Sequence, residues 1–218
     1  NIESPSEKPS HALLIVLALL LAVVWLGTLN VRKLVRPDEG RYAEIPREMV
    51  ATGDWLTPRL NGIKYFEKPP LQYWATATAY TVFGEHEWSA RLWPALCGVL
   101  CVLLTWFAGC RLFGERVGFY AALILAASPG FLLVAQINTL DMGLTLFMTG
   151  TLLFLLLALQ DSTRKNSPWM IAAWACAALA MLSKGLISIV LPGMVFVACM
   201  LLQRDWRLLT RLNWLPGL

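Results

Sequence analysis

The sequence predicts an all-α polytopic membrane protein, and three observations support that prediction. The chain has 218 residues, of which 57% are hydrophobic and only 15% are charged, and its mean hydropathy is +0.59. A soluble domain carries about 25% charged residues. The apolar residues form long runs without charge, and one polar stretch, residues 36–70, separates the first run from the others.

The first apolar run predicts an uncleaved membrane span. Residues 11–31 contain no Asp, Glu, Lys or Arg, and about 20 apolar residues are enough to cross a bilayer core. Basic residues follow the run, whereas a signal peptide would end in a cleavage site of small residues. We therefore expect residues 1–10 to form a cytoplasmic tail and residues 11–31 to form the first transmembrane helix.

Five further spans are predicted within residues 88–202. Residues 169–202 contain one charge, Lys184, and as a single helix would be about 51 Å long, against a bilayer core of about 30 Å. We therefore predict two spans there that turn at residues 183–185, and then a cytoplasmic loop, 203–218, that leads to a C-terminal part beyond this chain. The other three spans are predicted from the uncharged runs 92–110, 117–135 and 142–159.

Basic residues in the short loops predict the orientation, because cytoplasmic loops are richer in Lys and Arg. Loops with two or three of these residues alternate with loops that have none or one. The richer loops are 111–116, 160–168 and 203–211, and the poorer loops are 136–141 and 183–185. The N-terminus is therefore predicted to be cytoplasmic, and residues 32–87 are predicted to be external, on the same side as Asp141 and Lys184.

The external loop is predicted to contain two helices at the membrane surface. Tyr42, Ile45 and Met49 recur at helical spacing with charged residues between them, which predicts an amphipathic helix over residues 39–51. The segment after this helix is interpreted as irregular coil. Residues 71–83 are apolar but too short to span a bilayer, so they predict a second, interfacial helix.

Two acidic residues are candidates for catalysis, and each has a structural alternative. Asp38 follows the first span and precedes the amphipathic helix, so it is either a helix N-cap or a general base at the membrane surface. Asp141 begins the fourth span, where capping shared with Thr139 is the alternative. It is the only acidic residue between Glu115 and Asp161. Both carboxylates are predicted on one external face, where they can position an acceptor or a metal.

Side chains suited to phosphate crowd the same loop. Arg offers a forked pair of hydrogen bonds, Lys a point charge and Tyr a neutral hydroxyl. Contact with lipid head groups is the alternative for the basic residues, and Glu67 can simply balance the charge of Lys68. The candidate substrate-binding residues are Arg41, Tyr42, Tyr65, Glu67, Lys68 and Lys184.

Several classes of protein are disfavoured. The chain has no Walker loop and no GxGxxG, GxSxG or HExxH motif, which argues against chemistry on ATP or nucleotide sugars. The net charge of +4 is spread over many loops and indicates no nucleic-acid interface. A secondary transporter would place ionisable groups near the membrane midplane, whereas these lie outside the apolar runs. A non-catalytic scaffold would not need Asp38 and Asp141 on one side.

The motifs DEGRYAEI and GDWLTPRLNGIKYFEKPP identify a specific resemblance, which continues through GEHEWSARLWPAL, QINTLDMGL and LSKGLISIVLP. Together they resemble the GT-C membrane glycosyltransferases of the protein-mannosyltransferase-like superfamily over nearly the whole chain. The bacterial branch that transfers 4-amino-4-deoxy-L-arabinose to lipid A is the most similar. The resemblance implies a GT-C bundle that continues beyond the six transmembrane helices expected here, followed by a C-terminal soluble domain.

The resemblance also implies an activity and a location. It implies inverting transfer of the aminoarabinose from undecaprenyl phosphate to a lipid A phosphate, on the periplasmic side of the bacterial inner membrane, which gives resistance to polymyxin. Transfer of mannose or another sugar to a protein or another lipid stays open as the alternative. No nucleic-acid partner is implied.

The same resemblance assigns roles to single residues. Asp38 matches the catalytic acid of the first external loop, and Asp141 matches a second acid near the acceptor. Lys68 matches a residue near the donor phosphate. Glu67 matches a residue that in some relatives helps to hold a divalent metal, with its partner ligand beyond Leu218. The family does not depend uniformly on a metal, and no cofactor is implied as required.

Overall fold

The computed structural model describes residues 23–160, 168–204, 206 and 212. The predicted tail and most of the first span lie outside the described residues, as does most of the predicted C-terminal loop. Residues 23–27, at the end of the first span, are helical.

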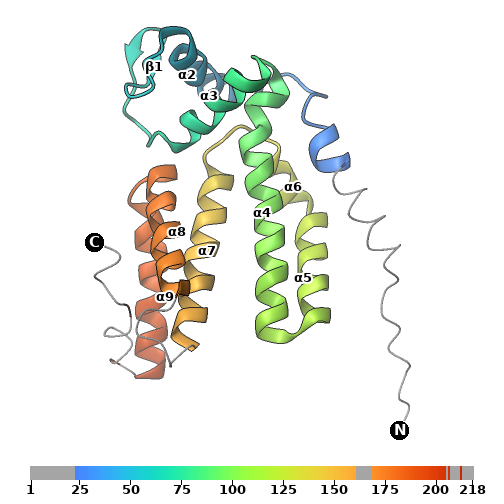
Figure 1. Cartoon of the computed structure of the whole chain (residues 1–218), viewed down its shortest axis with the longest axis vertical. Helices are drawn as coiled ribbons and strands as arrows, with labels where there is room; N and C mark the ends of the chain where they lie inside the picture. The colour runs from blue at the N-terminus through green and yellow to red at the C-terminus, as the bar shows by residue number, and fades with distance from the viewer. Residues whose placement is uncertain (1–22, 161–167, 205, 207–211, 213–218) are drawn as a thin grey trace.

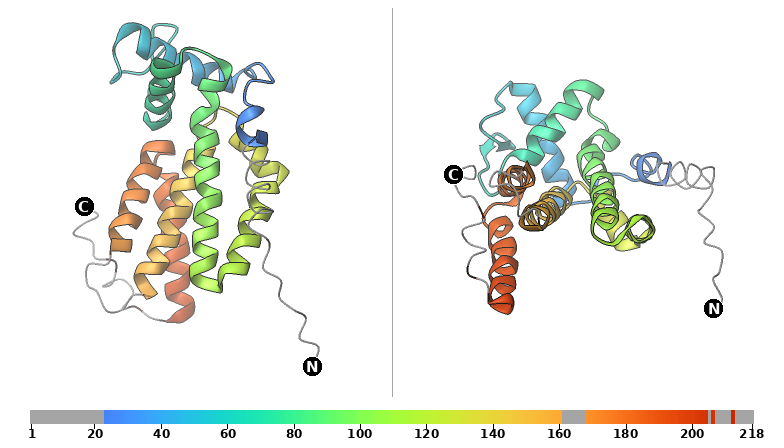
Figure 2. Two further views of the ribbon diagram at one scale, coloured as in Figure 1. Left: turned by 45° about the vertical axis from the view of Figure 1, so that its right-hand side comes forward. Right: turned by 60° about the horizontal axis from the view of Figure 1, so that its bottom comes forward.

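A bundle of apolar helices has a smaller polar cap at one end (Figures 1 and 2). The bundle comprises α4 (Glu87–Phe113), α5 (Glu115–Ala127), α6 (Pro129–Ala135), α7 (Asp141–Gln160), α8 (Pro168–Lys184) and α9 (Ile187–Gln203). The cap comprises α2 (Asp38–Thr52), β1 (Arg59–Leu60), β2 (Ile63–Lys64) and α3 (Leu71–Phe83). The predicted all-α fold is therefore confirmed, with one small hairpin added.

By length and composition, α4 and α7 can each cross a membrane, and α5 with α6 makes a third candidate if the pair is one span. The pair is bent by 66°, because Pro129 cannot donate the backbone hydrogen bond that would continue α5 and instead starts α6. The apolar helices α8 and α9 have 17 residues each. They are separated at Gly185, whose φ of 80° ends α8 close to the predicted turn. The number of spans and their orientation remain predictions.

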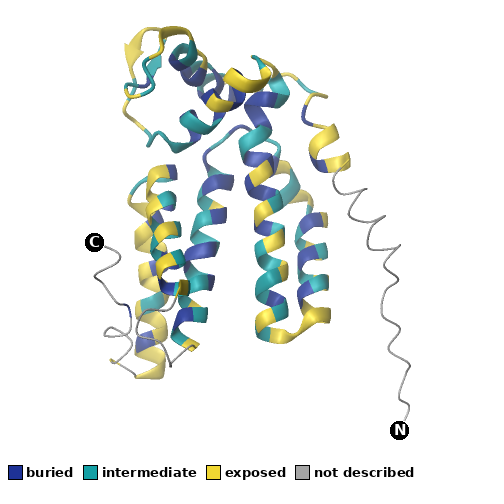
Figure 3. Cartoon of the chain, in the orientation of Figure 1, coloured by how far each residue is buried: buried dark blue, intermediate teal, exposed yellow. Residues whose placement is uncertain are grey.

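Small residues let the bundle helices approach closely, as is typical of membrane proteins. A Cβ atom added at Gly109 of α4 would lie 2.4 Å from the Cα of Gly118 in α5. A Cβ atom at Gly150 of α7 would lie 2.8 Å from Sγ of Cys176 in α8. Large apolar side chains remain exposed along much of α9 (Figure 3), so this surface is suited to lipid or to further helices.

The cap is organised around α2 and α3. Tyr42, Ile45 and Met49 of α2 are buried against Tyr73 and Ala77 of α3, as the helical spacing predicted. The segment interpreted as irregular coil contains the hairpin β1–β2 instead, since residues 61 and 62, an Asn-Gly pair, both have positive φ and close a two-residue turn. The carboxylate of Glu48 accepts hydrogen bonds from both backbone amides of that turn and attaches the hairpin to α2.

Candidate active site

Arg41 connects α2 to the segment that carries Glu67. Residues three apart are neighbours on a helix, so the first turn of α2 brings Arg41 to Asp38, where Nη2 donates a hydrogen bond to Oδ1 at 2.5 Å. Nη1 of Arg41 lies 3.9 Å from Oε2 of Glu67, and the guanidinium lies over the ring of Tyr42. Two acidic residues from separate segments therefore share one guanidinium.

Asp38 is the first residue of α2 and does not cap it. The N-cap position belongs to Pro37, and the start of α2 has no side-chain capping hydrogen bond. The capping alternative for Asp38 is therefore wrong in this structure. Its side chain is 56% exposed, so the carboxylate is accessible to a substrate at the surface of the cap.

Glu67 sits among hydrogen-bond donors. The hydroxyl of Tyr65 donates to Oε2 at 2.7 Å, and Nζ of Lys68 lies 3.3 Å from Oε1. The bond from Tyr65 and the charge of Lys68 lower the pKa of Glu67. Burial and the bond to Glu67 raise the pKa of Tyr65 to about 12, so its hydroxyl stays neutral at physiological pH.

Within the described residues, Glu67 is surrounded by hydrogen-bond donors rather than by further metal ligands, and its role toward a metal with a partner ligand beyond Leu218 stays a prediction. Tyr65, Lys68 and Arg41 offer donors, which compete with a cation for the carboxylate. Within residues 23–160 and 168–204, no three His, Cys, Asp or Glu side chains converge in an arrangement that could hold a metal. In this part of the chain, Glu67 instead orients the donors around it.

Asp141 and Lys184 form an ion pair between the start of α7 and the end of α8. Both side chains are partly exposed. The next residue, Gly185, lies against the cap, because a Cβ atom there would be 3.9 Å from Cγ of Pro69. The LSKGL and EKPP motifs, which are more than a hundred residues apart in the sequence, therefore meet where the cap joins the bundle.

Tyr42 lies among the charged residues of both motifs. Burial is the main reason why its pKa is raised, and the carboxylates of Asp38, Glu67 and Asp141 act in the same direction while Arg41 opposes them. Tyr42 is only 6% exposed, and its ring packs against that of Tyr73. Tyr42 is therefore mainly a core residue that supports the site, and its neighbours Arg41, Tyr65 and Lys68 are more accessible to a substrate.

Sequence reasoning missed a buried ion pair, Glu39–Arg91. Nε and Nη2 of Arg91 in α4 donate to the two carboxylate oxygens of Glu39 at 2.8 and 2.9 Å. The side chains are 0% and 1% exposed for Arg91 and Glu39. Arg91 also donates to the backbone carbonyls of Leu29, Arg32 and Lys33. The pair therefore fixes the chain just before Asp38 to the start of α4.

Glu39 is fully paired despite its burial. The backbone amides of Val35 and Asn138 donate to its two oxygens. Burial alone would raise the pKa of Glu39, but the bonds from Arg91 and the two amides outweigh it and lower the pKa. The sequence held a signal for this residue, because Glu39 lies three positions before Tyr42 on the buried face of α2.

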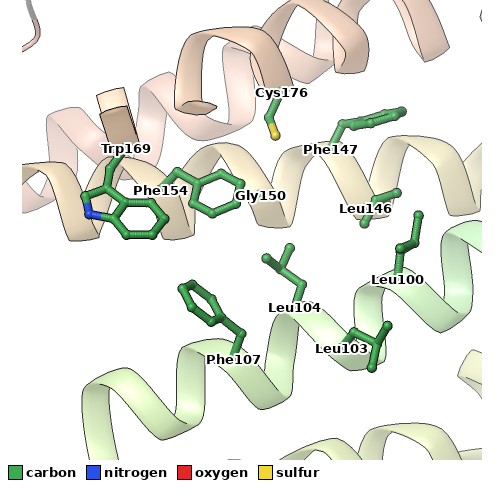
Figure 4. Close-up of a pocket in the computed structure, with 10 residues that line it drawn as sticks. All are labelled: Leu100, Leu103, Leu104, Phe107, Leu146, Phe147, Gly150, Phe154, Trp169 and Cys176. Atoms are coloured by element: carbon green, nitrogen blue, oxygen red, sulfur yellow. The ribbon is translucent and has the colours of Figure 1, made fainter. Parts of the chain in front are cut away.

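An open pocket of about 520 Å³ lies between α4, α7 and α8, away from these charged residues. Side chains of α4, such as Leu104, face α7 and α8 across it, and Phe154 and Trp169 line the other side (Figure 4). Its lining is formed by Leu, Phe, Trp, Gly and Cys residues and offers no acid or base. This lining therefore supplies no general acid or base, and the candidate catalytic side chains are those at the junction of cap and bundle.

Curated relatives match most of this chain. The undecaprenyl phosphate-alpha-4-amino-4-deoxy-L-arabinose arabinosyl transferase 2 of Proteus mirabilis is 33% identical over 195 residues, which cover 88% of this chain and 35% of that protein. The transferase of the same name from Edwardsiella ictaluri, without the numeral, is 34% identical, with the same coverage of 88% and 35%. The chain therefore spans about a third of the length of these relatives.

A solved structure has the same fold. The crystal structure of ArnT from Cupriavidus metallidurans bound to undecaprenyl phosphate matches with a TM-score of 0.92 and 43% identity, covering 95% of this chain and 39% of that one. Its apo state matches with the same TM-score. This likeness confirms the predicted polytopic membrane fold.

The part of the chain that matches a known family includes most of the residues at the junction of cap and bundle. Residues 67–218 match the family described as dolichyl-phosphate-mannose-protein mannosyltransferase. That range begins at Glu67 and includes Lys68, Asp141 and Lys184, while α2 and Asp38 precede it. Because the match extends over more than half of the sequence, the chain belongs to the dolichyl-phosphate-mannose-protein mannosyltransferase family.

Proposed function

We propose that the full-length protein transfers 4-amino-4-deoxy-L-arabinose from undecaprenyl phosphate to a phosphate of lipid A. The observation that carries this proposal is the approach of Gly185 to Pro69, which brings Lys184 and Asp141 beside the segment of Glu67 and Lys68. Two acidic residues and several basic ones thereby meet at one end of an apolar bundle. The relatives are named for this sugar and this carrier, which supports the choice of substrate.

The donor side of the reaction requires a stabilised leaving group. The acceptor oxygen attacks the anomeric carbon from the face opposite the donor phosphate, and the bond from that carbon to the phosphate oxygen breaks. Its electron pair leaves with undecaprenyl phosphate, whose negative charge increases. We assign Lys68 and Arg41 to stabilise that charge, because preorganised cationic donors favour developing negative charge. Tyr65 adds a neutral hydroxyl beside them.

The acceptor side sets the role of Asp38. A lipid A phosphate is already anionic, so it does not need a base to become nucleophilic. Asp38 then orients the acceptor or removes a last proton. With a hydroxyl acceptor, the same carboxylate would take the proton as general base. Asp141, held by Lys184, is assigned to the acceptor as well.

The proposal includes the membrane side on which the reaction occurs. Both substrates are bilayer-bound, so the site must open at the lipid surface. The cap at one end of the apolar bundle has the form that this requires, and α3 is apolar enough to lie at the interface. The alternating basic residues of the loops assign this face to the periplasmic side of the bacterial inner membrane.

The test is complementation of a bacterial strain that lacks its own aminoarabinose transferase. The strain receives the full-length protein or its Asp38→Asn variant, and lipid A is analysed by mass spectrometry. We expect the mass increment of one pentosamine, together with polymyxin resistance, only with the unchanged protein. The exposed Asp38–Arg41 pair contributes only about 0–1 kcal/mol to stability, so the variant should keep its expression level and its unfolding temperature.

The matched control is Glu44→Gln, which removes a second exposed ion pair of the same spacing from α2. This variant should still modify lipid A. Unmodified lipid A with the unchanged protein would contradict the proposed acceptor. If a secreted protein gained a hexose instead, the substrate would be that of the mannosyltransferase alternative.

A further inference from the structure

Two buried amide side chains join the cap to the connection between α6 and α7, which runs along the end of the bundle that faces the cap (Figure 1). Nε2 of Gln72, in the first turn of α3, donates a hydrogen bond to Oδ1 of Asn138 at 2.6 Å. Both residues are almost completely buried. Gln72 follows Lys68 by four positions, and Asn138 precedes Asp141 by three. The pair therefore connects two segments that carry candidate site residues.

The same connection is also bound to α2. The backbone amide of Asn138 donates to Oε1 of Glu39 at 2.9 Å, and Glu39 is the neighbour of Asp38 in the sequence. Leu140, which lies between Asn138 and Asp141, is buried in the apolar core of the cap. Asn138 therefore connects α2, α3 and the start of α7, through one main-chain and one side-chain hydrogen bond.

Stability alone does not account for the amide pair. Oε1 of Gln72 and Nδ2 of Asn138 have no hydrogen-bond partner among the described residues, although both atoms are buried. A buried polar atom without a partner lowers the stability of a protein, whereas two apolar side chains of the same shape would avoid that loss. What the pair supplies is direction, because a hydrogen bond sets both the distance and the angle between its groups, and apolar contact does not.

We propose that Gln72 and Asn138 are positioning residues, which hold Asp141 at a fixed place relative to Lys68 and Asp38. The inference rests on the proposed transfer reaction, in which the acceptor must lie in line with the bond that breaks at the donor. The reacting atoms have to approach to about 3–3.5 Å, and a displacement of about 1 Å can cost about 100-fold in rate. Both amides are buried, so they act through the segments that they hold and do not touch the substrate.

The test removes the hydrogen bond without leaving either amide unpaired. In the full-length protein, Gln72→Met with Asn138→Leu replaces both amides by apolar side chains of similar size, so the unfolding temperature should stay close to that of the unchanged protein. With purified donor and lipid A, kcat should nevertheless fall at least about tenfold. Affinity for undecaprenyl phosphate should stay within about twofold, because Lys68 and its neighbours are unchanged.

A shorter amide gives a second test. Gln72→Asn withdraws the amide by one methylene group, so kcat should fall, and Gln72→Asn with Asn138→Gln restores the combined length and should recover most of the lost rate. The matched control is Thr151→Val, because the Thr151 hydroxyl donates to the carbonyl of Phe147 within α7. Thr151 lies about 15 Å along the helix from Asp141, so kcat of this control should be unchanged.

A distance measurement tests the inference without the reaction. Spin labels are attached at Asn61→Cys, in the exposed turn of the cap hairpin, and at Thr145→Cys, an exposed position one turn after Asp141. In the full-length protein without other cysteines, pulsed electron resonance then gives the distribution of distances between the cap and α7. We expect a wider distribution in the apolar double variant than in the unchanged protein or in Thr151→Val.

Two results would overturn the inference. One is a folded apolar double variant that transfers the sugar as fast as the unchanged protein does, and the other is a distance distribution as narrow as that of the unchanged protein. If the apolar double variant does not fold, an unchanged kcat in Gln72→Asn has the same meaning. If the unchanged protein transfers no aminoarabinose, the proposed function fails, and the distance distribution alone decides whether the pair holds α7 against the cap.

Discussion

Asp38 and Glu39 are consecutive residues with opposite surroundings. Each step along a helix turns a side chain by about 100°, so Asp38 faces the surface of the cap while Glu39 faces α4. The first keeps an exposed carboxylate and the second is bound by Arg91 and two backbone amides. Glu39 therefore holds the start of α2 in place, and Asp38 is presented from that fixed position.

The Glu39–Arg91 pair should be costly to break. Removal of one partner leaves the other buried and unpaired, which destabilises a protein by about 3–5 kcal/mol. We expect Arg91→Met and Glu39→Gln each to lower the unfolding temperature of the purified protein strongly, and the double variant to lose less than the sum of both. If the loss of stability in the double variant equals the sum of the two single losses, the two side chains do not interact.

The same pair predicts how stability depends on pH. The pKa of Glu39 is lowered on folding from its ordinary value of 4.5, so its contribution is present above that value and is lost as pH falls through the folded-state pKa. In unfolding experiments from pH 7 downwards, the unchanged protein should lose more stability below about pH 4.5 than Glu39→Gln does. Parallel curves for the two proteins would assign the acid sensitivity to other carboxylates.

Lys68 is predicted to contact the phosphate of the lipid carrier. Loss of a charged hydrogen bond costs about 1.5–3 kcal/mol, so Lys68→Ala should weaken binding of undecaprenyl phosphate roughly 10- to 150-fold. Lys64→Ala is the matched control, because Lys64 lies in the same loop with an exposed side chain. Affinity for the carrier can be measured in detergent. If Lys68→Ala, like Lys64→Ala, binds the carrier as tightly as the unchanged protein does, Lys68 has only a structural role beside Glu67.

At the scale of elements, the residue pattern within a segment predicted the helices, but it did not predict which segments pair with one another. The stripe of Tyr42, Ile45 and Met49 placed α2 within one residue of each of its ends, and apolar length placed α3. The hairpin was missed although Asn61-Gly62 is a strong turn signal, because its two strands have only two residues each. Glu39 was missed as a buried residue because its partner, Arg91, is 52 residues away in the sequence.

The candidate site could likewise be predicted within single segments but not where distant segments meet. The separate motifs that carry Asp38, Lys68 and Asp141 were predictable from residue type and from the resemblance of each segment to known relatives. The contact between Gly185 and Pro69 was not, because it depends on how α8 packs below the cap. Lys184 was predicted to bind a phosphate of the substrate, and its ion pair with Asp141 was not predicted.

The close contact of α4 and α5 predicts a sharp difference between two glycines. A Cβ atom at Gly109 would lie 2.4 Å from the backbone of Gly118, so the helices must move apart. Gly109→Ala should therefore destabilise the protein, by about 1–3 kcal/mol, as overpacking does. Gly130→Ala is the control, because no atom lies within 4 Å of the added Cβ atom. Equal unfolding temperatures for both variants would contradict this packing.

At the scale of the whole molecule, the polar cap and the apolar bundle have different roles: the candidate reacting groups lie where the cap joins the bundle, and the bundle provides apolar surface. Ion pairs of the candidate site, such as Asp38–Arg41 and Asp141–Lys184, gather where the cap joins the bundle. The bundle supplies apolar surface, much of it exposed on α9. Such a division suits substrates whose reacting groups are polar and whose remainder is hydrocarbon.

This division predicts that the two ends of the bundle face opposite sides of the membrane. The exposed residue Asn61 lies in the turn of the cap hairpin, and Glu115 lies at the other end, where α5 begins. In a full-length protein without other cysteines, Asn61→Cys should react with an impermeant maleimide in cells whose outer membrane has been made permeable. Glu115→Cys should react only after the inner membrane is broken, because the adjoining loop carries Arg111 and Arg116 and is predicted to be cytoplasmic. The reverse labelling pattern would place the cap in the cytoplasm and would contradict the proposed periplasmic location of the site.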